Sequence, residues 1–167
     1  MTEQTQQGTY GESFKYFADR QQDPSRRTAL NVQNTSTREG YPTLSVEIAA
    51  LQGSRADWGN KVTLQLTKNE LTAFCSVLFG LRNSMEGRFH GDARNKGISA
   101  FFNGPKGAAI VLSEKGRQLH SFLPPDDQLE LAVFCIRRLA EAWRMTPADA
   151  IAMLRQASWM ARSAASP

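Results

Sequence analysis

Thr67-Lys-Asn-Glu-Leu-Thr-Ala-Phe-Cys75 and Asp127-Gln-Leu-Glu-Leu-Ala-Val-Phe-Cys135 are the two stretches of sequence that decide the fold. They share the signature E-L-x-x-F-C at an offset of sixty positions. Each begins with a residue that caps helices, followed three positions later by glutamate, which is a capping box. Leucine and phenylalanine then recur at helical spacing and form an apolar stripe. The pattern predicts two similar helices and an internal duplication, although chance similarity between helix starts is the alternative.

Alternating apolar and polar residues precede each helix, as in strands that bury one face. The predicted strands are residues 28–34, 44–48 and 62–66 in the first half, and 88–90, 98–102, 109–112 and 119–123 in the second. Pro124-Pro125 ends the second set, and the second helix should reach about Trp143. The sequence therefore predicts an α+β protein in which a strands-then-helix unit occurs twice.

The two ends of the chain differ from this pattern. Residues 1–24 are rich in Gln, Thr, Gly and Asp, which predicts a flexible tail whose last part could be ordered. Residues 25–145 form the main domain. Residues 146–167 form a C-terminal helix and tail, because Thr146 can cap a helix whose first residue is Pro147.

Composition favours one globular, intracellular domain. The chain has 167 residues, 41% of them apolar and 22% charged, close to the average for soluble proteins. It has no apolar run of roughly 20 residues and no signal-peptide pattern at its start. Cys75 and Cys135 lie within the apolar stripes, so we expect buried, free thiols that pack in the core. A disulfide or a reactive thiol is the less favoured alternative.

Positive charge is concentrated between Arg82 and His120. Seven basic residues against three acidic ones in this stretch equal the whole net charge of +4. Phe89, Phe101, Phe102 and Phe122 are interleaved with these basic residues on the predicted strands. Aromatic rings on a sheet can stack on bases while Lys and Arg hold phosphates, although burial in the core is the alternative for each ring. Since Phe101 and Phe102 are adjacent, at most one of them faces solvent.

Signals for catalysis are weak. His90 and His120 have no second metal-type ligand at helical spacing. His90-Gly91-Asp92 is a short match that a turn or a structural hydrogen bond explains far more often than a catalytic or metal site does. The sequence contains no glycine-rich phosphate loop. We therefore expect a protein that is not an enzyme and has no cofactor or metal.

Two segments carry a resemblance to a known family. Asp57-Trp58-x-x-Lys61-x-x-Leu64-x-Leu66-Thr67-x-x-Glu70-Leu71 resembles the strand-to-helix junction of the Whirly family of single-stranded DNA-binding proteins. Arg88-Phe89-His90-Gly91-Asp92 resembles that family's phenylalanine-histidine-aspartate segment. Arg26-Arg27-Thr28-Ala29-Leu30 is a weaker match to a lysine-glycine-lysine-alanine-alanine-leucine motif, with Ser25 and Arg26 in place of its first lysine and its glycine. The resemblance covers roughly residues 26 to 143, and no counterpart is evident for the last helix.

The resemblance implies two four-stranded antiparallel sheets packed on helices, a homotetramer joined through the helices, and single strands lying across the sheets with little sequence preference. Single-stranded DNA is favoured, and RNA is the other possibility because related mitochondrial guide-RNA-binding proteins share the architecture. The implied role is in DNA protection, recombination, replication or transcription, in the cytoplasm or nucleoid. The predicted contacts are Arg26, Arg27, Lys61, Arg88, Phe89, Arg94, Lys96, Phe101, Lys106, Lys115, Arg117 and Phe122.

A second hypothesis keeps the same scaffold but assigns it another function. On this interpretation the protein is an interaction or assembly module that binds another protein through the extra C-terminal helix. Ile151, Leu154 and Trp159 would supply the contact.

Overall fold

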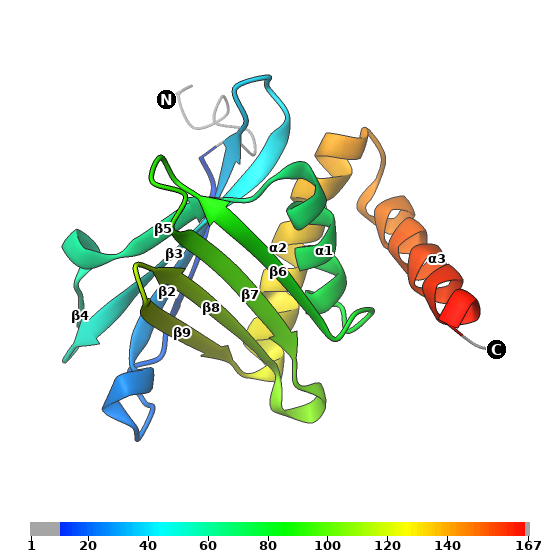
Figure 1. The fold of residues 1–167 in the computed structure, drawn as a ribbon. Coiled ribbons are helices and arrows are strands. Elements are labelled where there is room, and N and C mark those ends of the chain that lie inside the picture. Colours follow the sequence, from blue (N-terminus) through cyan, green and yellow to red (C-terminus); the bar gives the residue numbers. More distant parts are fainter. Residues whose placement is uncertain (1–10, 166–167) are drawn as a thin grey trace, which may run out of the picture.

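The computed structural model describes residues 11–165, which form two antiparallel sheets and three α-helices (Figure 1). The first sheet contains β1 (Ser13–Phe17), β2 (Thr28–Ser36), β3 (Pro42–Gln52), β4 (Arg55–Ala56) and β5 (Val62–Gln65). β4 only extends one end of β3, so the body of this sheet is four strands in the order β1-β2-β3-β5. The second sheet contains β6 (Ser84–His90), β7 (Lys96–Phe102), β8 (Ala108–Glu114) and β9 (Arg117–Leu123), paired in chain order. The predicted α+β class and the two four-stranded sheets are confirmed.

The first strand corrects the predicted N-terminal tail. Ser13–Phe17 pairs with β2 along its whole length, so this part of residues 1–24 belongs to the sheet. The physical reason is burial: Phe14 and Tyr16 pack against the core, and the Phe14 ring lies 6.4 Å from that of Phe134. Residues 1–10 of the predicted tail lie outside the described residues.

The first and third helix starts agree with prediction. α1 (Lys68–Leu78) begins with the complete capping box, in which Thr67 accepts from the Glu70 N–H while the Glu70 carboxylate accepts from the Thr67 N–H. α3 (Pro147–Ala165) begins after Thr146, whose hydroxyl accepts from the Asp149 N–H at 3.2 Å.

The start of α2 (Pro125–Trp143) differs from the predicted capping box at Asp127, which is wrong. Pro124 is the cap and Pro125 the first helical residue, a position where the missing N–H costs nothing. Gln128, inside the first turn, is buried and donates to the Leu78 carbonyl at 2.9 Å. The helix therefore begins earlier than predicted, and its first turn is tied to the end of α1. Its end at Trp143 is as predicted.

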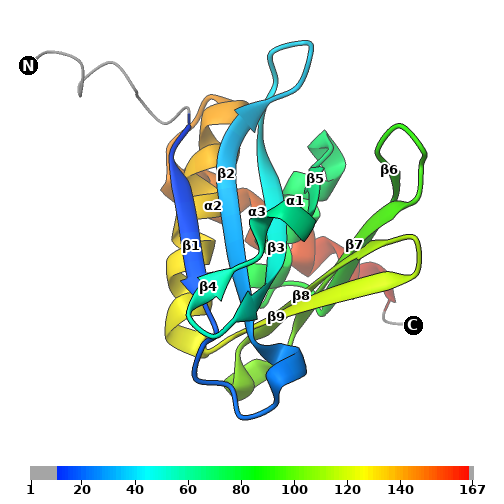
Figure 2. The same cartoon turned by 90° about the vertical axis from the view of Figure 1, so that its left-hand side faces the viewer.

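Each of the first two helices packs mainly on the sheet of the other half. α1 follows the first sheet but contacts β6 and β7, whereas α2 follows the second sheet but contacts β3 and β1. Figures 1 and 2 show α1 and α2 together on one side of the second sheet. The fully buried Cys75 and Cys135 belong to this shared layer, as predicted, and burial raises the pKa of both thiols. They are therefore protonated packing residues.

A buried arginine fastens α2 to the first sheet. Arg138 is 2% exposed, and its guanidinium donates to the carbonyls of Thr43, at 3.0 Å, and Thr35. It also binds the Glu141 carboxylate at 2.8 Å. A buried charge is tolerated only when it is paired and hydrogen-bonded in this way. The clamp fixes the helix across the ends of β2 and β3.

Candidate nucleic-acid interface

The second sheet has one face against the helices and one face toward solvent. Met85, Ile98, Ala100, Ile110 and Leu112 point into the core. The registers place the alternate residues in rows across the other face: Ser84–Phe101–Ala109–Phe122, then Glu86–Ser99–Val111–His120, and finally Gly97–Ser113–Gln118. We call this surface the outer face. Its middle strands carry small residues such as Gly97, Ser99 and Ser113, together with the exposed ring of Phe101.

A β-bulge interrupts the outer face in β6. Gly87 pairs with Ile98 and His90 with Lys96, so Arg88 and Phe89 together stand opposite Gly97. A bulge of this kind bends a strand and re-aims its side chains. Phe89 has φ +64°, which is a rare conformation for a bulky residue, and its ring is 64% exposed. Strain and exposure together mark Phe89 as a candidate functional residue.

The Glu70 side chain of α1 lies against both ends of this bulge, at Gly87 and at His90. Its carboxylate lies 2.9 Å from His90 Nε2, and a Cβ built on Gly87 would meet Glu70 Oε2 at 1.9 Å. A side chain at this position would therefore require the Glu70 carboxylate to move from where it lies against β6. Burial acts to raise the pKa of Glu70, but hydrogen bonds from His90 and Thr67 outweigh it, so that the pKa is lowered. The charged carboxylate therefore binds the His90 side chain and lies beside Gly87, at the two ends of the bulge.

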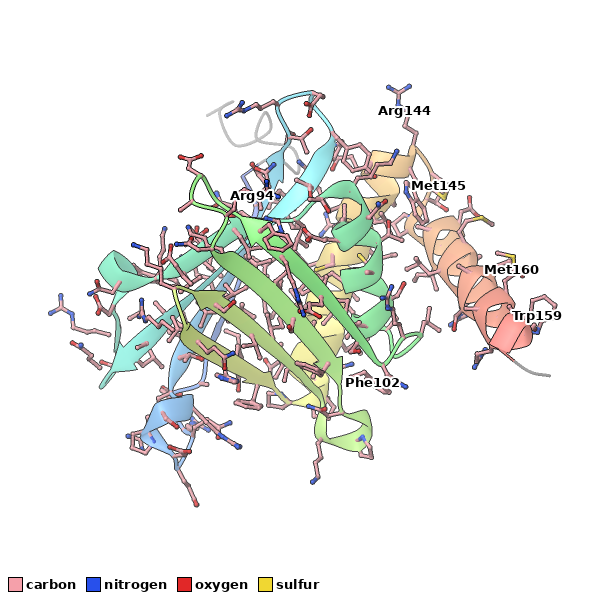
Figure 3. All side chains as sticks on the ribbon, in the orientation of Figure 1. Arg94, Phe102, Arg144, Met145, Trp159 and Met160 are labelled. Atoms are coloured by element: carbon pink, nitrogen blue, oxygen red, sulfur yellow. The ribbon has the colours of Figure 1, made fainter. Side chains whose placement is uncertain are left out.

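The exposed ring is accompanied by positive charge and a hollow. The Arg94 guanidinium lies 5.4 Å from the centre of the Phe89 ring, a cation–π contact. Beside the ring is a hollow of about 280 Å³ with Gly97, Ser99, Ser113 and Gln118 among its lining residues. Figure 3 shows Arg94 at the β6–β7 turn, on the end of the sheet where the β8–β9 turn also lies. That second turn carries Lys115 and Arg117, both exposed.

A second aromatic cluster occupies the opposite end of the outer face. The rings of His120 and Phe122 are stacked with centres 5.9 Å apart, and the Arg26 guanidinium lies 4.5 Å from the centre of Phe122. Phe101, 40% exposed, is in the same row as Phe122, whereas Phe102 turns inward and packs on α1 beside Gly80. Lys106 lies with Arg26 and Phe122 around a hollow of about 360 Å³. Only one of the two adjacent phenylalanines faces solvent, as predicted from their alternation.

Five further predicted contacts have a partner within the protein, although Arg88 and Arg117 remain exposed at the surface. Arg27 donates to the carbonyls of Gln21 and Gln22, and Lys61 pairs with Glu47 at 2.9 Å. Lys96 donates to the Thr63 carbonyl at 3.0 Å and so joins β7 to β5. Arg88 pairs with Glu86 at the surface, and Arg117 donates to the Asn60 carbonyl. The structure therefore brings Arg26, Arg88, Phe89, Arg94, Phe101, Lys106, Lys115, Arg117 and Phe122 to the outer face and its rim.

Other parts of the described surface are less suited to binding nucleic acid. A hollow of about 830 Å³ beside β1 mixes Arg20 and Arg26 with Asp19, Asp23 and Asp127, so it does not favour a polyanion. Within residues 11–165, no group of three or more His, Cys, Asp and Glu residues is placed to hold a metal ion. No helix in the same part of the chain is long and apolar enough to cross a membrane.

Sequence reasoning missed several contributors to the interface. Glu70 was predicted as a helix cap only, and His120 was considered only as a catalytic or metal-binding candidate. Gly97, Ser113 and Gln118 were not considered. The register of β7, β8 and β9 places these last three in one row, and neighbouring residues along the chain cannot reveal that row.

These features define the class: an α+β domain of two antiparallel sheets and helices, with an open, aromatic and basic sheet face. No family model matches the chain, and comparison with curated proteins gives no match either. Among solved structures, the chain is similar to the plant transcriptional regulator PBF-2, with a TM-score of 0.59 and 13% sequence identity over 79% of this chain and 90% of that one. The chain therefore has the Whirly-like fold that its sequence motifs predict.

The contacts of Glu70 predict a pH-dependent stability. Because its folded-state pKa is below the ordinary value of 4.5, the ionised carboxylate stabilises the fold above that value, and this contribution is lost as the pH falls through the folded-state pKa. We expect Glu70→Gln to be less stable than the wild type in urea unfolding at neutral pH, with a difference that shrinks below about pH 4.5. Glu130→Gln, at an exposed site on α2, is the control. An equal loss of stability at neutral pH and below about pH 4.5 would contradict a stabilising role for the ionised Glu70 carboxylate.

Proposed function

We propose that the outer face binds single-stranded nucleic acid, with single-stranded DNA favoured and little overall sequence preference. The observation that carries this proposal is Phe89, an exposed ring in a strained conformation with Arg94 beside it. Stacking on such rings suits any base, because every base has a π-face. Phe89 stands opposite Gly97, four residues along β7 from Phe101, so the two aromatic clusters are about 13 Å apart. A single strand could contact both, whereas bases paired inside a duplex could not.

Basic groups border the same surface. Six of them, Arg26, Arg88, Arg94, Lys106, Lys115 and Arg117, lie at the outer face or its two ends. They suit the phosphates of a strand whose bases stack on the rings. We propose a role in DNA protection, recombination, replication or transcription, which follows from the Whirly-like fold and from binding with little sequence preference.

A second candidate function rests on α3. Met153, Trp159 and Met160 are each at least half exposed, and Figure 3 shows Trp159 and Met160 on the side of the helix away from the sheets. Leu154 is buried and Ile151 partly buried against the core, so neither is free for a partner as the sequence had suggested. An exposed apolar helix face is a typical protein-interaction surface. A protein partner that binds α3 after nuclease treatment and at high salt would favour this candidate.

Binding to matched oligonucleotides tests the main proposal. We expect an unstructured DNA strand to bind more tightly than the duplex of the same sequence, with matched RNA as a further arm. If all six basic groups neutralise phosphates, the logarithm of the affinity should fall with the logarithm of salt concentration with a slope of about −4. Fluorescence anisotropy across a salt series measures both. Equal affinity for single strand and duplex at every salt concentration would contradict the proposal.

Replacement of Phe89 by glycine separates binding from stability. Glycine adopts a positive φ without the cost of about 1–2 kcal/mol that other residues incur, and the lost ring is mostly exposed. We therefore expect Phe89→Gly to keep the free energy of unfolding within about 1 kcal/mol while its affinity for a single strand falls about tenfold.

Arg144→Gly is the matched control for this variant. Arg144 also has a positive φ, of +56°, but it lies at the end of α2 and projects away from the sheets (Figure 3). Its replacement should leave single-strand affinity unchanged. If Phe89→Gly bound a single strand with wild-type affinity, Phe89 would not be part of the binding site.

We also propose that α2 joins copies of the chain, with a homotetramer as the assembly that the resemblance implies. Leu129 and Val133 are exposed, one helical turn apart, and both lie on this helix. Light scattering should give about four times the chain mass of 18.5 kDa for the wild type and a smaller mass for Val133→Glu. Met153→Glu on α3 is the control and should keep the wild-type mass. Dissociation by Met153→Glu alone would place the interface on α3.

A further inference from the structure

Gly97 forms the floor of the hollow beside Phe89. Gly97 is the residue opposite the bulge, so Arg88 and Phe89 flank backbone that carries no side chain. A Cβ at this position would lie 3.1 Å from the Gly87 carbonyl oxygen and 3.1 Å from Ser113 Oγ, tighter than ordinary contacts. With no side chain at Gly97, the floor of the hollow is bare backbone, against which a planar ring could lie.

The walls of the hollow carry unused hydrogen-bonding groups. Ser113 pairs with Gly97 on one side and Gln118 on the other, which places the Gln118 carboxamide across the floor from Phe89. Strands are about 4.8 Å apart, so β6 and β9 are separated by about 14 Å, and in this row only Gly97 and Ser113 lie between them. Among the described residues, the side chains of Ser99, Ser113 and Gln118 form no hydrogen bond with one another or with any other group.

The two ends of the outer face therefore differ in chemistry. At the far end, the Phe122 ring already contacts His120 and Arg26, and stacking dominates. At the Phe89 end, a ring, a bare floor and a free carboxamide meet in one hollow. Stacking tolerates any base, whereas a carboxamide discriminates between bases by their donors and acceptors.

We propose that this hollow, which we call the seat, binds one nucleobase and recognises the hydrogen-bonding edge of that base. Adenine is the base that fits it best. A glutamine carboxamide can accept from the N6 amine and donate to N7 of adenine at once. The carboxylate of Glu86, which would favour cytosine, is engaged by Arg88. This inference rests on the proposed single-strand binding and adds a one-base preference to contacts that are otherwise sequence-tolerant.

The test compares four DNA strands: a short oligothymidylate, and the same strand with one central thymine replaced by adenine, guanine or cytosine. A single adenine lets the protein bind in the register that places it in the seat. We expect the adenine strand to bind about tenfold more tightly than plain oligothymidylate, as measured by fluorescence anisotropy. In Gln118→Leu this preference should disappear while affinity for plain oligothymidylate stays within about twofold, because stacking and phosphate contacts are unchanged.

Gln65→Leu is the matched control, since Gln65 is an exposed strand glutamine on the other sheet. It should keep the adenine preference. Equal binding of all four strands, together with weaker binding of duplex, would overturn the seat and leave the proposed function standing. An adenine preference that survives in a folded Gln118→Leu protein would also overturn it. Failure of every strand to bind would overturn both.

Discussion

The candidate interface depends on the contacts that the Glu70 carboxylate makes with the start of α1 and with β6. This carboxylate completes the capping box of α1, binds His90 at the end of β6 and occupies the space that Gly87 leaves free. One side chain thus joins a helix start in the first half of the chain to a strand in the second half. Because the carboxylate lies at both ends of the bulge, it supports the strained backbone from which the Phe89 ring reaches solvent. A site prepared in this way loses less conformational freedom on binding.

The intertwined packing of the two halves explains why the outer face is open. α1 and α2 cover the inner surfaces of the sheets, and Arg138 clamps α2 across the ends of β2 and β3. The second sheet therefore needs no further layer to bury its apolar residues, and its other face can carry small, polar and aromatic side chains. Stability comes from one side of this sheet, and binding is proposed for the other. This division also separates the repeated E-L-x-x-F-C helices from the residues proposed to contact nucleic acid.

Local patterns predicted much of the fold. The caps at Thr67 and Thr146, the alternation in the strands and the apolar setting of Cys75 and Cys135 depend on near neighbours, which the sequence displays directly. β1 was missed because its alternation is short and adjoins a polar segment. The start of α2 was misplaced because the chain is already helical at Pro125, so that the predicted cap Asp127 lies inside the first turn. The next residue, Gln128, turns inward to meet Leu78.

The candidate site was less predictable, because its residues depend on partners far away in the chain. Lys96 looked like a phosphate contact, but its ammonium meets the Thr63 carbonyl on the other sheet. The bulge at Phe89 arises from the register between β6 and β7, and the row that ends at Gln118 depends on the pairing of β7, β8 and β9. The Whirly resemblance did point to the segment around Phe89 and His90, although it did not show how Glu70 holds that segment.

Photo-crosslinking of a bound single DNA strand, followed by mass spectrometry, tests the central claim most directly. The account predicts that crosslinked peptides come from β6, β7 and β9, with Phe89 and Phe122 among the modified residues. Crosslinks confined to α3 or to the first sheet would contradict it.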